Sequence, residues 1–98
     1  MKIAVGSDHR GYKVKAKVIE LLENFGHESS DQGTHSEESV DYPDIASAVS
    51  SQVASGEVDR GILICGTGIG MAITANKFAG VRAAAVYDEV AAELCRRH

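Results

Sequence analysis

Residues 61–70 read GILICGTGIG, a short apolar run that ends in a cysteine followed by glycines at alternate positions. An uninterrupted apolar strand is typical of a parallel sheet that helices cover on both faces. A glycine-rich turn follows, and the spacing then predicts a helix over residues 70–78. Strand, turn and helix in this order predict an α/β protein with a parallel sheet.

The rest of the chain alternates between a hydrophobic period of two and one of 3.6. Strands are expected over four segments: 2–6, 27–31 (polar, an edge strand), 61–65 and 81–87. Helices are expected over four others: 11–25, 41–56, 70–78 and from Asp88 onward. In the first helix, the apolar stripe predicts the buried face: Val14, Val18, Leu21, Leu22 and Phe25. The order predicts a single three-layer α/β/α, Rossmann-like domain over residues 1–98 with right-handed crossovers.

Composition excludes several classes of protein. The 98 residues carry 10 Lys and Arg against 14 Asp and Glu, a net charge of −4 with no basic stripe, which argues against nucleic acid as a partner. No apolar run approaches the roughly 20 residues of a membrane span. Cys65 and Cys95 are too few for a disulfide scaffold, and no metal-ligand spacing occurs. The composition predicts a cytoplasmic globular domain without a metal.

Two polar clusters are expected to meet at the carboxyl edge of the sheet. Gly6-Ser7-Asp8-His9 follows the first strand, and Cys65 to Gly70 follows the third. If the second strand pairs outside the first and the third pairs on its other side, the strand order reverses between these clusters. Open α/β sheets bind ligands at such a point.

The loop Gly66, Thr67, Gly68, Ile69 and Gly70 suits an oxyanion or phosphate, because glycines let backbone N–H groups approach a ligand. A tight turn that needs glycine for its own sake is the alternative. The spacing matches neither a dinucleotide fingerprint nor a Walker A loop, and the arginine of a cysteine phosphatase loop is absent.

Four polar side chains lie near the predicted edge or at the chain end, and two interpretations stay open for Cys65 and for Asp8. Cys65 is either a thiolate base or nucleophile, or an inert core residue. Asp8 is a ligand or a cap, and His9 is a substrate contact by position alone. His98 follows Arg96-Arg97 as the last residue, where position alone predicts a frayed end.

At these residues the sequence resembles the B-type ribose-5-phosphate isomerases, a family that includes the galactose-6-phosphate isomerase subunits. The resemblance runs in order along the whole chain. It lies in residues 1–9, Gly33-Thr34, 38–44, 61–70, 75–77, 80–84 and Arg97-His98.

The resemblance implies an aldose–ketose isomerase of the pentose phosphate pathway, without metal or cofactor, that interconverts ribose 5-phosphate and ribulose 5-phosphate through an enediolate. It implies a homodimer or homotetramer. Cys65 matches the base, and His98 matches the acid/base that opens the sugar ring. Asp8 and His9 match substrate-binding positions, and Gly66, Thr67, Gly68, Ile69 and Gly70 match the loop that stabilises the enediolate oxygen.

The family's chains continue beyond this histidine with an asparagine, a further strand, a long helix and phosphate-binding arginines. The sequence therefore resembles a family member truncated at the C-terminus. Three alternatives stay open: a galactose-6-phosphate or related isomerase, a catalytically silent sugar-phosphate-binding domain, and a phosphocysteine carrier. The carrier ranks last because its cysteine follows the first strand, whereas Cys65 follows the third.

Overall fold

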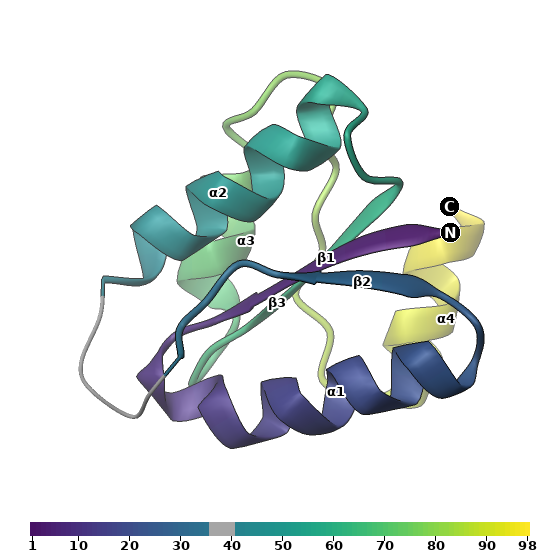
Figure 1. The fold of residues 1–98 in the computed structure, drawn as a ribbon. Coiled ribbons are helices and arrows are strands. Elements are labelled where there is room, and N and C mark those ends of the chain that lie inside the picture. The colour runs from purple at the N-terminus through teal and green to yellow at the C-terminus, as the bar shows by residue number, and fades with distance from the viewer. Residues whose placement is uncertain (36–40) are drawn as a thin grey trace.

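The computed structural model describes residues 1–35 and 41–98, which form strands and helices in alternation (Figure 1). The elements in chain order are β1 (Lys2–Ser7), η1 (His9–Gly11), α1 (Tyr12–Asn24), β2 (Glu28–Asp31), α2 (Tyr42–Ser55), β3 (Arg60–Ile64), α3 (Ile69–Ala75) and α4 (Glu89–Arg97). None of the helices in this part of the chain has the length and apolarity that a membrane crossing requires.

The sheet has three parallel strands in the order β2-β1-β3, which meets the condition on which the sequence analysis places the ligand site. In the register, Val5 of β1 lies opposite Asp31 of β2 and Ile62 of β3. Figure 1 shows α1 on one face of the sheet and α2 with α3 on the other, which confirms the layered α/β/α fold. Since β1 is central, its residues from Ile3 to Ser7 are buried.

Helix α2 packs closely on the strands because glycines stand beneath it. A Cβ placed on Gly61 would lie 2.6 Å from Val49 Cγ1, and one placed on Gly6 would lie 2.6 Å from Ile45 Cγ2. Val49 joins Ala4 and Val58 in the buried core. This close approach fixes α2 over the carboxyl half of β1, next to the predicted site.

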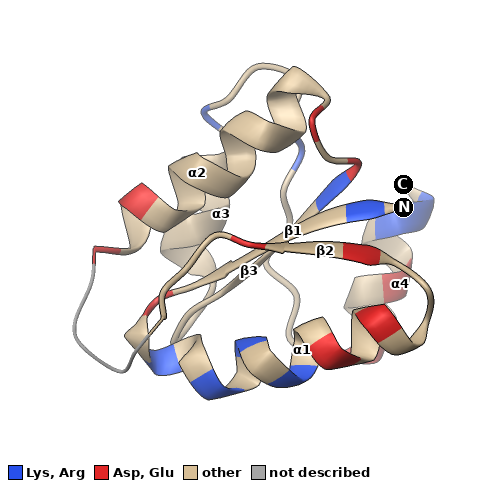
Figure 2. Ribbon diagram, in the orientation of Figure 1, with Lys and Arg blue, Asp and Glu red and all other residues tan. Residues whose placement is uncertain are grey.

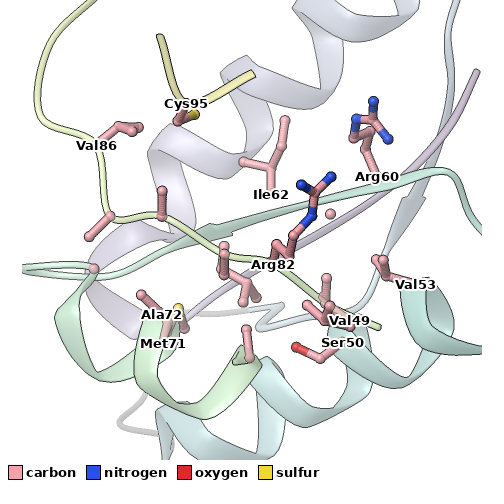
Figure 3. A pocket seen from close by; sticks show the side chains of 18 of the residues that line it. Val49, Ser50, Val53, Arg60, Ile62, Met71, Ala72, Arg82, Val86 and Cys95 are labelled. Carbon is pink, nitrogen blue, oxygen red and sulfur yellow. The ribbon is translucent and has the colours of Figure 1, made fainter. Parts of the chain in front are cut away.

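Residues 81–87 do not form a strand, contrary to the sequence prediction. Residues 81–86, with Ile62 and Leu63 of β3, line a pocket of about 460 Å³, in which Figure 3 labels Ile62, Arg82 and Val86. The segment is not part of the sheet among the described residues. The amide and carbonyl of Ala83 bond instead to the side chain of Asn76, both at 2.8 Å. With β1 as the one strand that pairs with it among the described residues, β3 is half-buried over Ile62–Ile64 rather than fully buried.

The buried face of α1 also differs from the prediction. Val14, Leu21 and Phe25 are 51%, 53% and 69% exposed, whereas Lys15 is 2% exposed. The reason is that α1 rests on β1 and on the short, polar β2, which offers the helix an acidic partner instead of apolar cover. The side chain that turns inward is therefore the one that can pair with Asp31.

Candidate active site

The two predicted polar clusters meet at the carboxyl edge of the sheet. The amide of Asp8, directly after β1, donates a hydrogen bond of 3.1 Å to the carbonyl of Ile64, the last residue of β3. Cys65 follows Ile64 in the chain. Asp8 and Cys65 therefore lie on adjacent strand ends, at the reversal of strand order where the sequence analysis places the ligand.

Asp8 caps the short helix that follows β1. Its Oδ1 accepts hydrogen bonds from the amides of Arg10 at 2.9 Å and Gly11 at 3.1 Å, and the residue is 8% exposed. These bonds hold η1 against the edge of the sheet and place half-buried His9 beside the site. The capping role that the sequence left open for Asp8 is thus present, whatever else the carboxylate does.

The loop after β3 folds back over the cysteine. The amide of Gly68 donates to Cys65 Sγ at 2.9 Å, and the amide of Ile69 donates to Thr67 Oγ1 at 3.2 Å. Gly68 adopts φ +77°, a left-handed conformation that costs a residue with a side chain free energy. The loop therefore directs one backbone N–H group, that of Gly68, at a half-buried sulfur, a geometry suited to negative charge on that atom.

Two side chains at this loop escaped the sequence analysis. A Cβ on Gly70 would lie 2.5 Å from Tyr42 Cζ, so the Tyr42 ring at the start of α2 rests on Gly70. A Cβ on Gly66 would lie 3.2 Å from Arg10 Nη1, so the guanidinium lies across Gly66. The alternate glycines were the signal for both, because glycine is also required where a neighbouring side chain approaches the backbone.

Positive charge gathers beside this edge although the chain as a whole is acidic. Figure 2 shows the Lys and Arg residues of η1 and α1 at the start of the helix, with the Glu residues towards its end. This distribution opposes the helix macrodipole, which favours acidic residues in the first turns. Arg10 and Lys13 instead provide positive potential where an anionic ligand would bind, whereas the charge of Lys15 is paired with Asp31.

His98 does not lie at this edge. It is exposed at the end of α4, where its amide donates to the carbonyl of Leu94 at 3.1 Å. Figure 1 places the C-terminus towards the end of the sheet at which β1 begins, whereas Asp8 and Cys65 lie at the opposite end. The structure therefore brings together Cys65, Asp8, His9 and the glycine loop, and leaves His98 of the same chain apart from them.

The described residues contain no group of three or more His, Cys, Asp or Glu side chains arranged to hold a metal ion.

The turn over residues 31–34, which begins at the end of β2, is held in place by a lysine. Asp31 Oδ1 accepts from Lys15 Nζ at 2.6 Å and from the amide of Gly33 at 2.9 Å.

Partial burial of Asp31 by itself raises the pKa of this carboxyl. The hydrogen bonds from Lys15 and Gly33, with the charges of Lys15 and His35, outweigh burial, so the pKa lies below its ordinary value. A lowered pKa stabilises the fold above the ordinary pKa of aspartate, and this stabilisation is lost as the pH falls through the folded value.

We therefore expect Asp31→Asn to lower the melting temperature near neutral pH, because the charged pair with Lys15 is lost. The difference from the wild type should shrink as the pH falls from neutral to below the ordinary pKa of aspartate, as Asp31 itself becomes protonated. Thermal unfolding followed by circular dichroism over this pH range measures the effect. A difference that stays constant with pH would contradict the assigned pairing.

The chain is similar in sequence to known proteins. The model of the Ribose/Galactose Isomerase family matches residues 3–98. The chain belongs to this family. It is 52% identical over 97 residues to ribose-5-phosphate isomerase B of Escherichia coli K12, covering 99% of this chain and 65% of that protein. It is 43% identical over 88 residues to the galactose-6-phosphate isomerase subunit LacB of Clostridium acetobutylicum, covering 90% of this chain and 51% of that subunit.

A solved structure of the Ribose/Galactose Isomerase family has the same fold. The ribose-5-phosphate isomerase B of Clostridium thermocellum superposes with a TM-score of 0.97 at 51% identity, over 100% of this chain and 66% of that one. The family resemblance and the fold expected from the sequence are thereby confirmed. The chain spans about two thirds of the length of these ribose-5-phosphate isomerases.

Proposed function

We propose that this chain carries the proton-transfer half of a sugar-phosphate isomerase site, which interconverts ribose 5-phosphate and ribulose 5-phosphate without metal or cofactor. The observation that carries the proposal is the 2.9 Å hydrogen bond from the Gly68 amide to Cys65 Sγ, with Asp8 on the adjacent strand end. A sulfur that accepts a backbone N–H bond within a glycine-rich loop suits proton abstraction next to a carbonyl. Membership of the Ribose/Galactose Isomerase family supports the same chemistry.

The proposed reaction moves one proton between adjacent carbons. The Cys65 thiolate takes the proton from C2 of the open-chain aldose, and the electron pair of that bond forms the enediolate while C1–O becomes anionic. The same sulfur returns the proton to C1 while the C2 hydroxyl proton passes to the anionic C1 oxygen, which leaves a hydroxyl at C1 and the carbonyl at C2. N–H groups of the loop from Gly66 to Gly70 stabilise the anionic oxygen, a contribution of about 3 kcal/mol for a single donor in other enzymes.

The phosphate and hydroxyl groups of the sugar would lie over η1. Asp8 and His9 come directly after β1, and the guanidinium of Arg10 lies across Gly66 at the rim of the loop. Arg10 in η1 and Lys13 in the first turn of α1 attract a dianionic phosphate to this edge. We propose that Asp8 and His9 contact the sugar phosphate and that the reaction belongs to the pentose phosphate pathway in the cytoplasm.

Ring opening requires a second acid/base, and the proposed residue is His98. Because His98 of the same chain lies at the far end of the sheet, it cannot share a sugar with its own Cys65. We propose a homodimer, alone or within a homotetramer, in which His98 of a second copy completes the site around Cys65. A two-fold axis would then create two equivalent sites.

Mixing two inactive variants tests this shared site. Cys65→Ala and His98→Ala should each lack activity on the cyclic sugar, and co-refolding equal amounts should restore about a quarter of wild-type activity. The reason is that half of the dimers are mixed and each mixed dimer has one intact site. A mixture no more active than its components would contradict a site built from two copies.

The function itself is tested by incubating the chain with ribose 5-phosphate and following ribulose 5-phosphate, beside a parallel incubation with galactose 6-phosphate. Turnover of the pentose phosphate supports the proposal. Preference for galactose 6-phosphate would favour the chemistry of the LacB relative. Binding of either sugar phosphate without turnover would favour a silent binding domain.

A further inference from the structure

Among the largest fully buried side chains of the described residues, that of Lys15 is the one that carries a charge. Its exposed fraction is 2%. Burying an ammonium group is costly unless it is paired and hydrogen-bonded. Its Nζ donates to Asp31 Oδ1 at 2.6 Å and to the carbonyl of Thr34, and lies 5.7 Å from the centre of the Tyr12 ring. The ammonium is therefore held at a defined point beneath the turn over residues 31–34.

That turn is bonded in both directions to the end of β1. The amide of Ser7 donates to the carbonyl of Gly33 at 2.7 Å, and the amide of Thr34 donates to the carbonyl of Ser7 at 2.9 Å. Ser7, Gly33 and Thr34 are all buried. The position of Ser7 thus depends on the turn, and the position of the turn depends on Lys15.

The residue directly after β1, Asp8, carries this constraint into the site. Asp8 bonds through its amide to the carbonyl of Ile64, the residue before Cys65, and through Oδ1 to η1. A shift of Ser7 would move Asp8 and η1 relative to the loop over Cys65. Hydrogen bonds therefore connect Lys15 to Thr34 and Thr34 to Ser7, and the peptide bond after Ser7 connects them to Asp8.

We propose that Lys15 is a positioning residue for substrate binding, which fixes the Asp8–His9 segment through the turn over residues 31–34. The proposal rests on the proposed function, in which Asp8 and His9 contact the sugar phosphate. Lys15 itself touches no reacting atom. Loss of the Lys15 charge should loosen the Asp8–His9 segment, which follows β1, and leave the proposed base Cys65, which follows β3, in place.

The test compares Lys15→Met, which keeps the length of the side chain without its charge, with Lys17→Met, an exposed lysine on the same helix. We expect Lys15→Met to raise KM about tenfold or more while kcat stays within about twofold, because the substrate contacts are misplaced rather than lost. Lys17→Met should change neither constant. A variant that is merely less stable would lower the apparent kcat, through loss of folded protein, and leave KM unchanged.

Amide hydrogen exchange supplies a second measurement that needs no activity. In Lys15→Met, the amides of Ser7 and Thr34 should exchange about tenfold faster than in the wild type, while those of β3 should not change. Should Lys15→Met fail to fold, Lys15→Arg and Asp31→Asn replace it in the test. We expect the KM of Lys15→Arg to lie nearer the wild-type value than the KM of Asp31→Asn, because arginine keeps the positive charge. If the wild-type chain converts no sugar phosphate, the proposed function fails, and exchange alone decides the role of Lys15. Unchanged exchange at Ser7 and Thr34 would overturn the proposal.

Discussion

Replacing Cys65 by alanine is expected to lower turnover of ribose 5-phosphate by roughly 10²–10⁴-fold, the usual contribution of a positioned acid/base group. The methyl group of alanine cannot take a proton from C2. The fold should survive, because Cys65 is only half-buried and follows the last residue of β3. Sugar-phosphate binding should stay detectable by calorimetry, since Asp8 and His9 are untouched.

Cys95 provides the matched control for this substitution. It is also half-buried, and its Sγ donates to the carbonyl of Ala92 at 3.2 Å, a contact confined to α4. Cys95→Ala should retain wild-type kcat and KM. Near-normal turnover in Cys65→Ala would remove the base from the proposed mechanism, and equal losses in both variants would point to a general effect on stability.

Replacing Gly68 by valine is expected to have the second-largest effect. A side chain at φ +77° costs about 1–2 kcal/mol, more when it is β-branched, so the loop relaxes towards another conformation. Relaxation moves the Gly68 amide away from Cys65 Sγ and the neighbouring N–H groups away from the enediolate oxygen. Since transition-state analogues depend on such groups more than substrates do, a hydroxamate mimic of the enediolate should lose more affinity than ribose 5-phosphate loses.

Gly56→Val separates the chemical effect from backbone strain. Gly56 has φ +80° at the end of α2, and, as at Gly68, no atom of the described structure lies within 4 Å of a Cβ placed there. Both valine variants should melt earlier by similar amounts, but only Gly68→Val should weaken binding of the mimic. If substrate and mimic lose affinity equally in Gly68→Val, the loop contributes ordinary binding rather than transition-state stabilisation.

Local patterns in the sequence predicted much of the fold and the core of the site. The apolar run before Cys65 predicted β3, and the polar residues of β2 predicted an edge strand; both are present in the order β2-β1-β3. Because parallel strands share one carboxyl edge, that order alone predicted that Asp8 and Cys65 would be neighbours. These features depend on short-range periodicity and chain direction, which any sequence displays directly.

Other features depend on what lies opposite a segment, and no local pattern encodes that. Residues 81–87 have the composition of a strand, yet no ladder forms between them and β3, and the backbone of Ala83 bonds to the side chain of Asn76 instead. The stripe of α1 predicted Val14 and Phe25 to be buried, but the sheet beneath the helix is too narrow and polar to cover them.

The sequence by itself determined the α/β class, the glycine loop after Cys65 and the family. Only the tertiary structure decided that Lys15 is buried against Asp31, that Tyr42 and Arg10 rest on the glycines of the loop, and that His98 lies far from its own Cys65. The physical reason is range. Hydrophobic periodicity and turn residues act over a few positions of the chain, whereas burial of a charge and closure of a site depend on partners that the fold brings from distant positions.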